Sequence, residues 1–281
     1  MLQRAVVAAT LCWTVLPWSA SSPAATGAPA VLPASGTSEP APRSNQVLES
    51  TVIGRSVRGH RIVAYRKGAA EPTDARRTVV LLGQLHGDER AGVTTARWVR
   101  DHVSVRTDVT VWIVPTMNPD GLARGTRTNA RGVDLNRNWP MNWRRTARGT
   151  TYSGRRAASE PETRAMLRFL RTVQPDAMTS LHQPYGEVGF YADKPRPFQR
   201  RLSRYLHLPL RGIGIGGPTP PEDPDPPPGL QPGGSDNAPT LTGWYNAHYP
   251  GTAITVEFRA HPERRFVRRA GTALLRAARA Y

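Results

Sequence analysis

Cysteine and lysine are almost absent from this chain. It has one cysteine, Cys12, and only two of its 38 basic residues, Lys67 and Lys194, are lysine. Because Cys12 lies in an N-terminal segment that we expect to be removed on export, the mature chain has neither a disulfide nor a reactive thiol. A domain of this length builds a stable core without disulfides.

Long apolar runs are also missing. The apolar stretch at residues 5–18 is too short to span a bilayer, but with Arg4 before it and small residues after it, at 19–25, it is typical of a secretory signal. We expect cleavage between Ala20 and Ala30. Residues 26–44, rich in Ala, Pro, Ser and Gly, predict a disordered linker. The expected organisation is therefore a signal peptide (1–25), a linker (26–44) and one domain (45–281) in an extracellular or wall-associated protein.

Acidic residues are the third scarcity. The chain has 21 of them against 38 basic residues, and its net charge is +17. A high-GC coding bias is the simpler explanation for so much arginine, and attraction to an anionic wall polymer or membrane surface is the functional alternative. Nucleic acid is not an expected partner, because no binding motif is present.

Strand-like and helix-like segments alternate after residue 45, which predicts one α/β domain with a mixed, mainly parallel central sheet flanked by helices. The predicted strands are residues 47–53, 62–65, 79–82, 109–114, 177–181, 189–191 and 253–258. The predicted helices are residues 88–102, 160–173, 198–206 and 263–281. Ser159 and Glu162 have the spacing of a capping box for the second helix.

His86 and Glu89 have the spacing of a metal clamp. They follow the predicted strand at residues 79–82, at the end of a strand where α/β sheets place their chemistry. Alone, this His-x-x-Glu pattern is weak evidence, since a surface helix start looks the same.

Four further motifs follow in order: NPDG at residues 118–121, RGVDLNRNWP at 131–140, TSLHQPYG at 179–186 and ITVEF at 254–258. Together with His86 and Glu89 they resemble the zinc carboxypeptidase family, and within it the bacterial murein peptide amidase type. The resemblance covers residues 45–281, and an ordered set of motifs is far more specific than any one of them.

The resemblance implies one zinc ion per chain, held by His86, Glu89 and His182. Two histidines and one glutamate are a common ligand set for a catalytic zinc with an open position for water. Asp134 would hold the second nitrogen of His86 and so fix its tautomer. Glu257, on an apolar strand, would be the general base.

The family pattern also implies substrate contacts. Asn136 and Arg137 would bind the terminal carboxylate of the substrate. Arg127 would polarise the scissile carbonyl, with Arg131 as the rival for that role. Thr242 would stand at the position that sets side-chain preference, and threonine there selects neither an acidic nor a basic side chain.

The family's digestive members have a tyrosine about twenty residues before the catalytic glutamate, and this chain has none there. What replaces that tyrosine stays open. The Pro-rich segment at residues 218–237 is expected to be a surface loop. Either it borders the cleft, where one of its carboxylates would meet an amino group of the substrate, or it is a solvated linker whose acidic residues only relieve local positive charge.

The expected function is that of a secreted, monomeric zinc metallopeptidase that hydrolyses an amide bond beside a free carboxylate in a cell-wall peptide, with γ-D-glutamyl-diaminopimelate as the specific substrate. The alternatives are a general metallocarboxypeptidase, a relative of the desuccinylases and aspartoacylases, and a non-catalytic wall-binding module. The NPDG and GVDLNRN motifs argue against the second alternative. Retention of every ligand and of Glu257 argues against the third.

Overall fold

The computed structural model describes residues 41–191, 194–212 and 239–281 of the 281-residue chain. The predicted signal peptide, nearly all of the predicted linker and the loop at residues 218–237 lie outside these ranges. None of the helices in the described ranges combines the length and the apolar character needed to cross a membrane.

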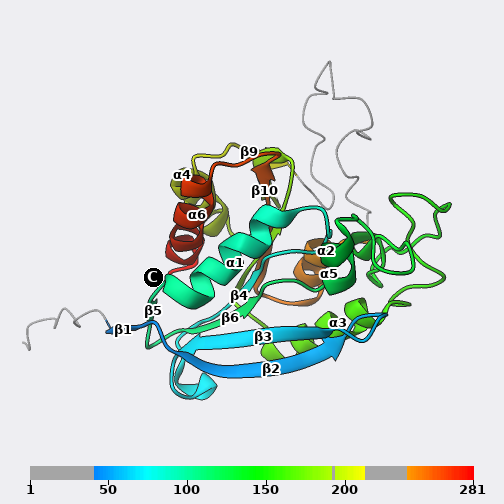
Figure 1. The fold of residues 1–281 in the computed structure, drawn as a ribbon. Helices are drawn as coiled ribbons and strands as arrows, with labels where there is room; N and C mark the ends of the chain where they lie inside the picture. The colour runs from blue at the N-terminus through cyan, green and yellow to red at the C-terminus, as the bar shows by residue number, and fades with distance from the viewer. Residues whose placement is uncertain (1–40, 192–193, 213–238) are drawn as a thin grey trace, which may run out of the picture. The chain divides into compact units, whose positions relative to one another are not determined.

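An eight-stranded mixed sheet forms the centre of the molecule (Figure 1). In spatial order its strands are β2 (Val47–Arg55), β3 (Arg61–Gly68), β6 (Thr110–Val114), β4 (Thr78–Leu82), β7 (Ala177–His182), β10 (Thr252–Arg259), β8 (Tyr185–Phe190) and β9 (Leu210–Gly212). The four central strands β6, β4, β7 and β10 are parallel. Strands β3 and β8 join this core antiparallel, one at each side. The predicted fold class is confirmed.

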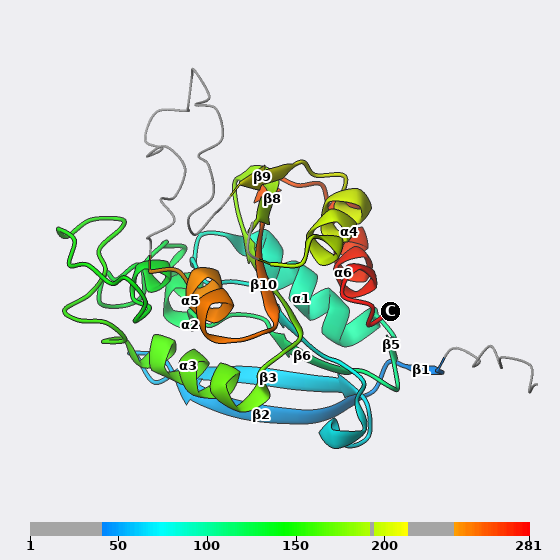
Figure 2. The same ribbon diagram turned by 180° about the vertical axis from the view of Figure 1, so that it is seen from behind.

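Helices cover both faces of the sheet (Figures 1 and 2). Helices α1 (Arg90–His102), α4 (Arg196–Leu206) and α6 (Arg264–Ala277) pack on the face that carries Val79 and Leu81. Helices α3 (Pro161–Val173) and α5 (Leu241–His248) pack on the face that carries Val80 and Leu82. Because successive side chains of a strand point to opposite faces, burying both faces favours continuous apolar runs, which β4 and β6 contain.

Shorter elements complete the fold: α2 (Pro119–Arg124), the strand pair β1 (Arg43–Ser44) and β5 (Val105–Arg106), and the 3-10 turns η1 (Pro72–Asp74) and η2 (Leu135–Arg137). The pairing of β1 with β5 shows that the last two residues of the predicted linker belong to the folded domain. The Arg43 guanidinium lies 4.1 Å from the ring centroid of Tyr281, which ties the segment down further.

The predicted capping box at α3 is wrong. The N-cap is Glu160, and no side chain caps this helix. Ser159 Oγ donates to Glu160 Oε1 instead, at 2.7 Å. The Glu162 carboxylate accepts from the backbone N–H of Val57 and from the side chain of Asn129. The Glu162 carboxylate is therefore bonded to donors that are distant in sequence, and not to the N-terminal end of the helix as the sequence pattern predicted.

Lys67 is a buried cation at the end of α1. Its side chain is 0% exposed, and Nζ donates to the carbonyl oxygens of Val99 at 3.2 Å, Arg100 at 2.9 Å and Val103 at 2.8 Å, and to Asn45 Oδ1 at 2.6 Å. The last carbonyls of a helix have no partner within the helix. The ammonium supplies that partner and balances the negative end of the helix dipole.

We predict that Lys67→Met lowers the free energy of unfolding by about 3–5 kcal/mol, because it leaves several buried carbonyls without a donor. Urea denaturation measures this change. The matched control, Arg97→Met, removes an exposed cation from the same helix and is expected to change stability by less than about 0.5 kcal/mol. Equal effects of the two substitutions would contradict the capping role.

Candidate metal centre

His86, Glu89 and His182 meet at the carboxyl ends of two neighbouring parallel strands. β4 ends at Leu82 and a turn carries His86 and Glu89 to the start of α1, while β7 ends at His182 itself. The turn must pass close to α2: a Cβ on Gly87 would lie 2.0 Å from the backbone of Gly121. The glycine in this turn therefore helps to fix the positions of the His86 and Glu89 side chains.

The three side chains are buried, and their donor atoms converge. His86 Nδ1 lies 2.7 Å from Glu89 Oε1, and His182 Nδ1 lies 3.0 Å from Glu89 Oε2. The two Nδ1 atoms are 3.2 Å apart. Despite its nearness to His182, Glu89 Oε2 has no hydrogen bond of acceptable geometry among the described residues. Its lone pairs are therefore available to a cation.

The outer nitrogens of both histidines are held by other groups. His86 Nε2 lies 3.0 Å from Asp134 Oδ1, and His182 Nε2 lies 3.1 Å from Ser180 Oγ. When Asp134 accepts the Nε2 proton of a neutral His86, Nδ1 presents a lone pair to the cluster. Two imidazole nitrogens and a carboxylate facing one point are a donor set that fits zinc.

Charges in the cluster shift its pKa values strongly. Burial alone would lower the pKa of His86, but the carboxylates of Glu89 and Asp134 raise it to about 9. Burial would raise the pKa of Glu89, yet the two histidines lower it to about 2. Burial lowers the pKa of His182, and Glu89 opposes this only in part. Burial also disfavours ionised Asp134, but His86 and Arg127 hold its pKa well below the usual range.

Arg127 is the arginine that lies at the cluster. Its Nε and Nη2 donate to Asp134 Oδ2 at 3.1 and 2.9 Å, and Nη1 lies 3.5 Å from Glu89 Oε1. The rival, Arg131, instead pairs with Glu160 at 3.5 Å and is about half exposed. Of the two candidates, only Arg127 has its guanidinium beside the candidate metal ligands.

Glu257 lies beside His182 on the neighbouring strand, where the two residues are direct partners in the β7–β10 register. One of its carboxylate oxygens, Oε2, is buried and has no hydrogen-bond partner among the described residues. Burial and the nearby charge of Glu89 raise the pKa of Glu257 to about 8, against the opposing effect of His86. A buried carboxylate oxygen without a hydrogen-bond partner is costly to maintain, and carboxyl groups with such a shifted pKa are concentrated at functional sites.

Asn136 and Arg137 lie on η2, directly after Asp134. The Asn136 backbone N–H donates to Asp134 Oδ1 at 2.8 Å, and its side-chain Oδ1 accepts from the N–H of Leu241 at the start of α5. Arg137 is partly buried, and among the described residues its side chain donates only to a backbone carbonyl, that of Asn136. No carboxylate in the described part of the chain lies within ion-pair distance of Arg137. The site therefore has a cation ready for an anionic ligand.

Thr242 is buried, and its hydroxyl already has two partners: Tyr191 OH at 2.6 Å and Thr255 Oγ1 at 3.0 Å. Neither of these hydrogen bonds is with His86, Glu89 or His182. Its role in substrate preference stays a prediction.

Three further residues lie near the site without having been predicted there. Glu187 is the direct cross-strand partner of Glu257, and Tyr185 pairs with Arg259 two residues further along the same strands. Tyr185 is one of the few large hydrophobic side chains that are exposed. Arg211, on β9, lies 3.8 Å from Glu187. In the sequence, Tyr185 and Glu187 alternate with Gly186 shortly after His182, as residues on one face of a strand do. This pattern points to the site only once β8 is known to pair with β10.

The model of the zinc carboxypeptidase family matches residues 39–197. The chain belongs to the zinc carboxypeptidase family. It is thus a member of a family of zinc-dependent hydrolases, as predicted from the motifs. The match contains His86, Glu89 and His182, and stops before Glu257.

The relatives include murein peptide amidases. The chain is 34% identical over 176 residues to murein peptide amidase A of Escherichia coli (strain K12), which covers 56% of this chain and 67% of that protein. It is 29% identical over 188 residues to murein peptide amidase A of Vibrio campbellii (strain ATCC BAA-1116), covering 60% and 70%. These similarities support the predicted resemblance to the amidase type.

Solved structures share the fold. Murein-tripeptide amidase MpaA from Escherichia coli O157 has a TM-score of 0.60 at 24% identity, covering 83% of this chain and 92% of that one. Carboxypeptidase A from Helicoverpa armigera has a TM-score of 0.64 at 17% identity, covering 83% and 67%.

We predict that Asp134→Asn weakens zinc binding by about 10- to 100-fold, because an amide supports the metal-binding tautomer of His86 less well than a carboxylate does. Competition with a chromogenic chelator measures the affinity. His86→Ala is expected to lose the ion, while the control Asp108→Asn, at a carboxylate paired with Arg106, keeps wild-type affinity. Unchanged zinc affinity in Asp134→Asn would show that Asp134 does not support the site.

Proposed function

We propose that the protein is a secreted zinc-dependent peptidase that hydrolyses an amide bond beside a free carboxylate in cell-wall peptides, with γ-D-glutamyl-diaminopimelate as the bond cleaved. The observation that carries the proposal is the position of Glu257 beside His182, one strand away from a ready set of metal ligands. A non-catalytic relative has no need of a carboxylate there with one buried oxygen that lacks a partner among the described residues.

His86, Glu89 and His182 would hold the zinc ion, which when bound supplies Lewis acidity and lowers the pKa of a water molecule. Glu257 accepts a proton from the attacking water at its free carboxylate oxygen and returns it to the leaving amine. Arg127 directs its guanidinium charge at the oxygen that becomes negative during attack. Asp134 holds both His86 and Arg127, and so fixes the ligand and the cation relative to each other.

Arg137 binds the free carboxylate of the substrate. It is a partly buried cation with no acidic partner in the described ranges, and a guanidinium pairs with a carboxylate through two parallel hydrogen bonds. This contact favours an amide bond next to a free carboxylate over an internal bond of a long peptide.

The pair of Glu187 and Arg211 supports the diaminopimelate side chain as the preferred one. Glu187 stands directly opposite Glu257, where two like charges repel each other, and burial raises its pKa against the effect of Arg211. The far end of diaminopimelate carries an ammonium and a carboxylate together. Glu187 would pair with the ammonium, and Arg211 would pair with the carboxylate. The contact predicted from residues 218–237 stays a prediction, because these residues lie outside the described ranges.

Export and wall association complete the proposal. The apolar segment at residues 5–18 with its small-residue flank supports secretion, and a net charge of +17 favours an anionic wall. A general metallocarboxypeptidase is the remaining alternative, and the Glu187–Arg211 pair is the feature that separates it from a wall-peptide enzyme.

We predict that Glu257→Gln lowers kcat on γ-D-glutamyl-diaminopimelate by about 100- to 10,000-fold, because an amide does not accept the proton of the attacking water. Zinc content and Tm, measured on the same preparation, are expected to stay at their wild-type values. Glu71→Gln, at an exposed glutamate outside the site, serves as the control. Retention of more than about a tenth of the wild-type rate would remove Glu257 as the base.

We predict that Glu187→Gln lowers kcat/KM by about 10- to 100-fold for γ-D-glutamyl peptides of diaminopimelate and of lysine, since a charged hydrogen bond to the ammonium is lost. The γ-D-glutamyl-norleucine peptide, which has no such ammonium, is expected to be cleaved equally by both enzymes. Arg211→Gln is expected to affect the diaminopimelate peptide alone. If the wild type prefers an ordinary C-terminal dipeptide to all three, the wall-peptide proposal fails whatever the variants do.

A further inference from the structure

Helices α4 and α6 pack side by side on the face of the sheet opposite to His182 and Glu257 (Figures 1 and 2). Neither helix contains an aspartate or a glutamate. Together they carry nine arginines: Arg196, Arg200, Arg201, Arg204, Arg264, Arg265, Arg268, Arg269 and Arg276. Packing two such helices together concentrates positive charge, which costs free energy unless anions neutralise it.

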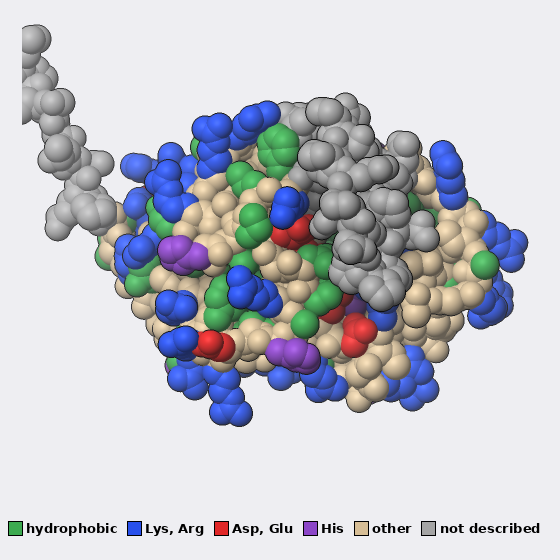
Figure 3. All heavy atoms as spheres, turned by 90° about the horizontal axis from the view of Figure 1, so that it is seen from above, with side chains coloured by type: hydrophobic (Ala, Val, Ile, Leu, Met, Phe, Trp, Pro, Cys, Tyr) green, Lys and Arg blue, Asp and Glu red, His purple; other side chains and the backbone are tan. Residues whose placement is uncertain are grey.

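The protein itself provides little neutralisation. Among the described residues, only Arg265 of these nine has a carboxylate within ion-pair distance, that of Glu263. Arg201 is crowded by like charge: burial first, and then Arg279 and Arg77, lower its pKa. Seen from above in Figure 3, basic side chains far outnumber acidic ones over the visible surface. This surface is therefore left positively charged and open to anions from solution.

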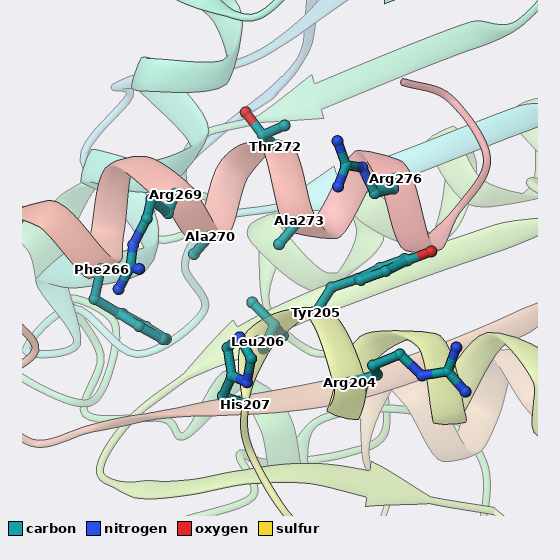
Figure 4. A pocket seen from close by; sticks show the side chains of 10 residues that line it. All are labelled: Arg204, Tyr205, Leu206, His207, Phe266, Arg269, Ala270, Thr272, Ala273 and Arg276. Carbon is teal, nitrogen blue, oxygen red and sulfur yellow. The ribbon is translucent and has the colours of Figure 1, made fainter.

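A groove of about 510 Å³ runs between the two helices (Figure 4). Arg204 and His207 line it from the end of α4, and Arg269, Thr272 and Arg276 line it from α6. All three arginines are exposed. The groove shares no residue with the candidate metal centre. It is large enough for a small ligand or a short stretch of a chain molecule.

The surroundings of the groove select among anionic partners. The exposed large hydrophobic residues in the described ranges are Val52, Tyr185 and Leu210, none of which lies on α4 or α6, so this face has nothing to insert into a bilayer. Its aromatic rings are already engaged: Phe266 packs edge-on against Phe258, and Arg276 lies over Tyr205. Rings with partners of this kind are poor platforms for nucleobases.

We propose that the groove between α4 and α6 binds a base-free phosphodiester polymer, of the type of poly(glycerol phosphate). Guanidinium groups pair with phosphate oxygens through two parallel hydrogen bonds, and arginines on both walls are arranged to contact successive phosphates of one strand. Binding relieves the repulsion between the two helices. The polymer would hold the enzyme at a surface while the metal centre, on the other face of the sheet, stays open to peptides.

The test compares two triple variants by titration of fluorescent poly(glycerol phosphate) into the full chain at several salt concentrations. The groove variant carries Arg204→Gln, Arg269→Gln and Arg276→Gln. The control carries Arg61→Gln, Arg168→Gln and Arg171→Gln at exposed positions elsewhere, and so has the same net charge.

We predict that the groove variant binds the polymer at least about 10-fold more weakly, and that its salt dependence falls by about 2 units in slope, as expected when three phosphate contacts are lost. The control variant is expected to stay within about 2-fold of the wild type. Both variants should keep wild-type Tm and wild-type kcat/KM on a soluble peptide.

If the two variants lose affinity for the polymer equally, the loss is due to overall charge and the proposal is overturned. Tight binding to phosphatidylglycerol vesicles without binding to the polymer would overturn it in favour of a membrane surface. Equal or tighter binding of oligothymidylate would overturn the base-free specificity. Each outcome is independent of peptide hydrolysis, so failure here leaves the proposed reaction untouched.

Discussion

Two imidazole nitrogens that lie 3.2 Å apart and face one buried carboxylate are the constraint on which the rest of this structure depends. Neutral histidines and Glu89 present only lone pairs to one another there, and lone pairs at this distance need a proton or a cation between them. The parallel strands β4 and β7 create the arrangement by ending side by side, and the turn after β4 completes it. The fold thus holds three donors in place before any ion arrives.

Charged groups around the three ligands keep those donors in position. Asp134 accepts from His86 on one side and from Arg127 on the other, so a single buried carboxylate sets both the imidazole tautomer and the place of the guanidinium. Glu257 completes the site from β10, with one buried carboxylate oxygen that has no hydrogen-bond partner among the described residues. Each of these groups is unfavourable alone, and a bound cation together with a substrate would satisfy them at the same time.

The sequence predicted the central strands from local signals, such as the apolar run of β4. It predicted the metal cluster only through the ordered motifs that resemble the family, since His86, Glu89 and His182 are weak signals when each is taken alone. It did not predict α2 and α5, since six and eight residues are too short for a clear helical period.

The predicted capping box was wrong because Val57 and Asn129, which are far away in sequence, donate hydrogen bonds to the Glu162 carboxylate. Only the structure distinguishes Arg127 from Arg131 as the arginine at the site. Arg127 pairs with Asp134 there, while Arg131 pairs with Glu160. The partnership of Glu187 and Glu257 likewise depends on strand register, which a single strand does not reveal.

The central claim is that His86, Glu89 and His182 hold one zinc ion. The zinc K-edge X-ray absorption spectrum of the protein, purified without chelator and loaded with one equivalent of zinc, tests it most directly. We expect scattering from two imidazoles and carboxylate oxygen with no sulfur contribution, and loss of one imidazole from the spectrum of His182→Ala. A spectrum of hydrated, unligated zinc, or one unchanged by His182→Ala, would contradict the claim.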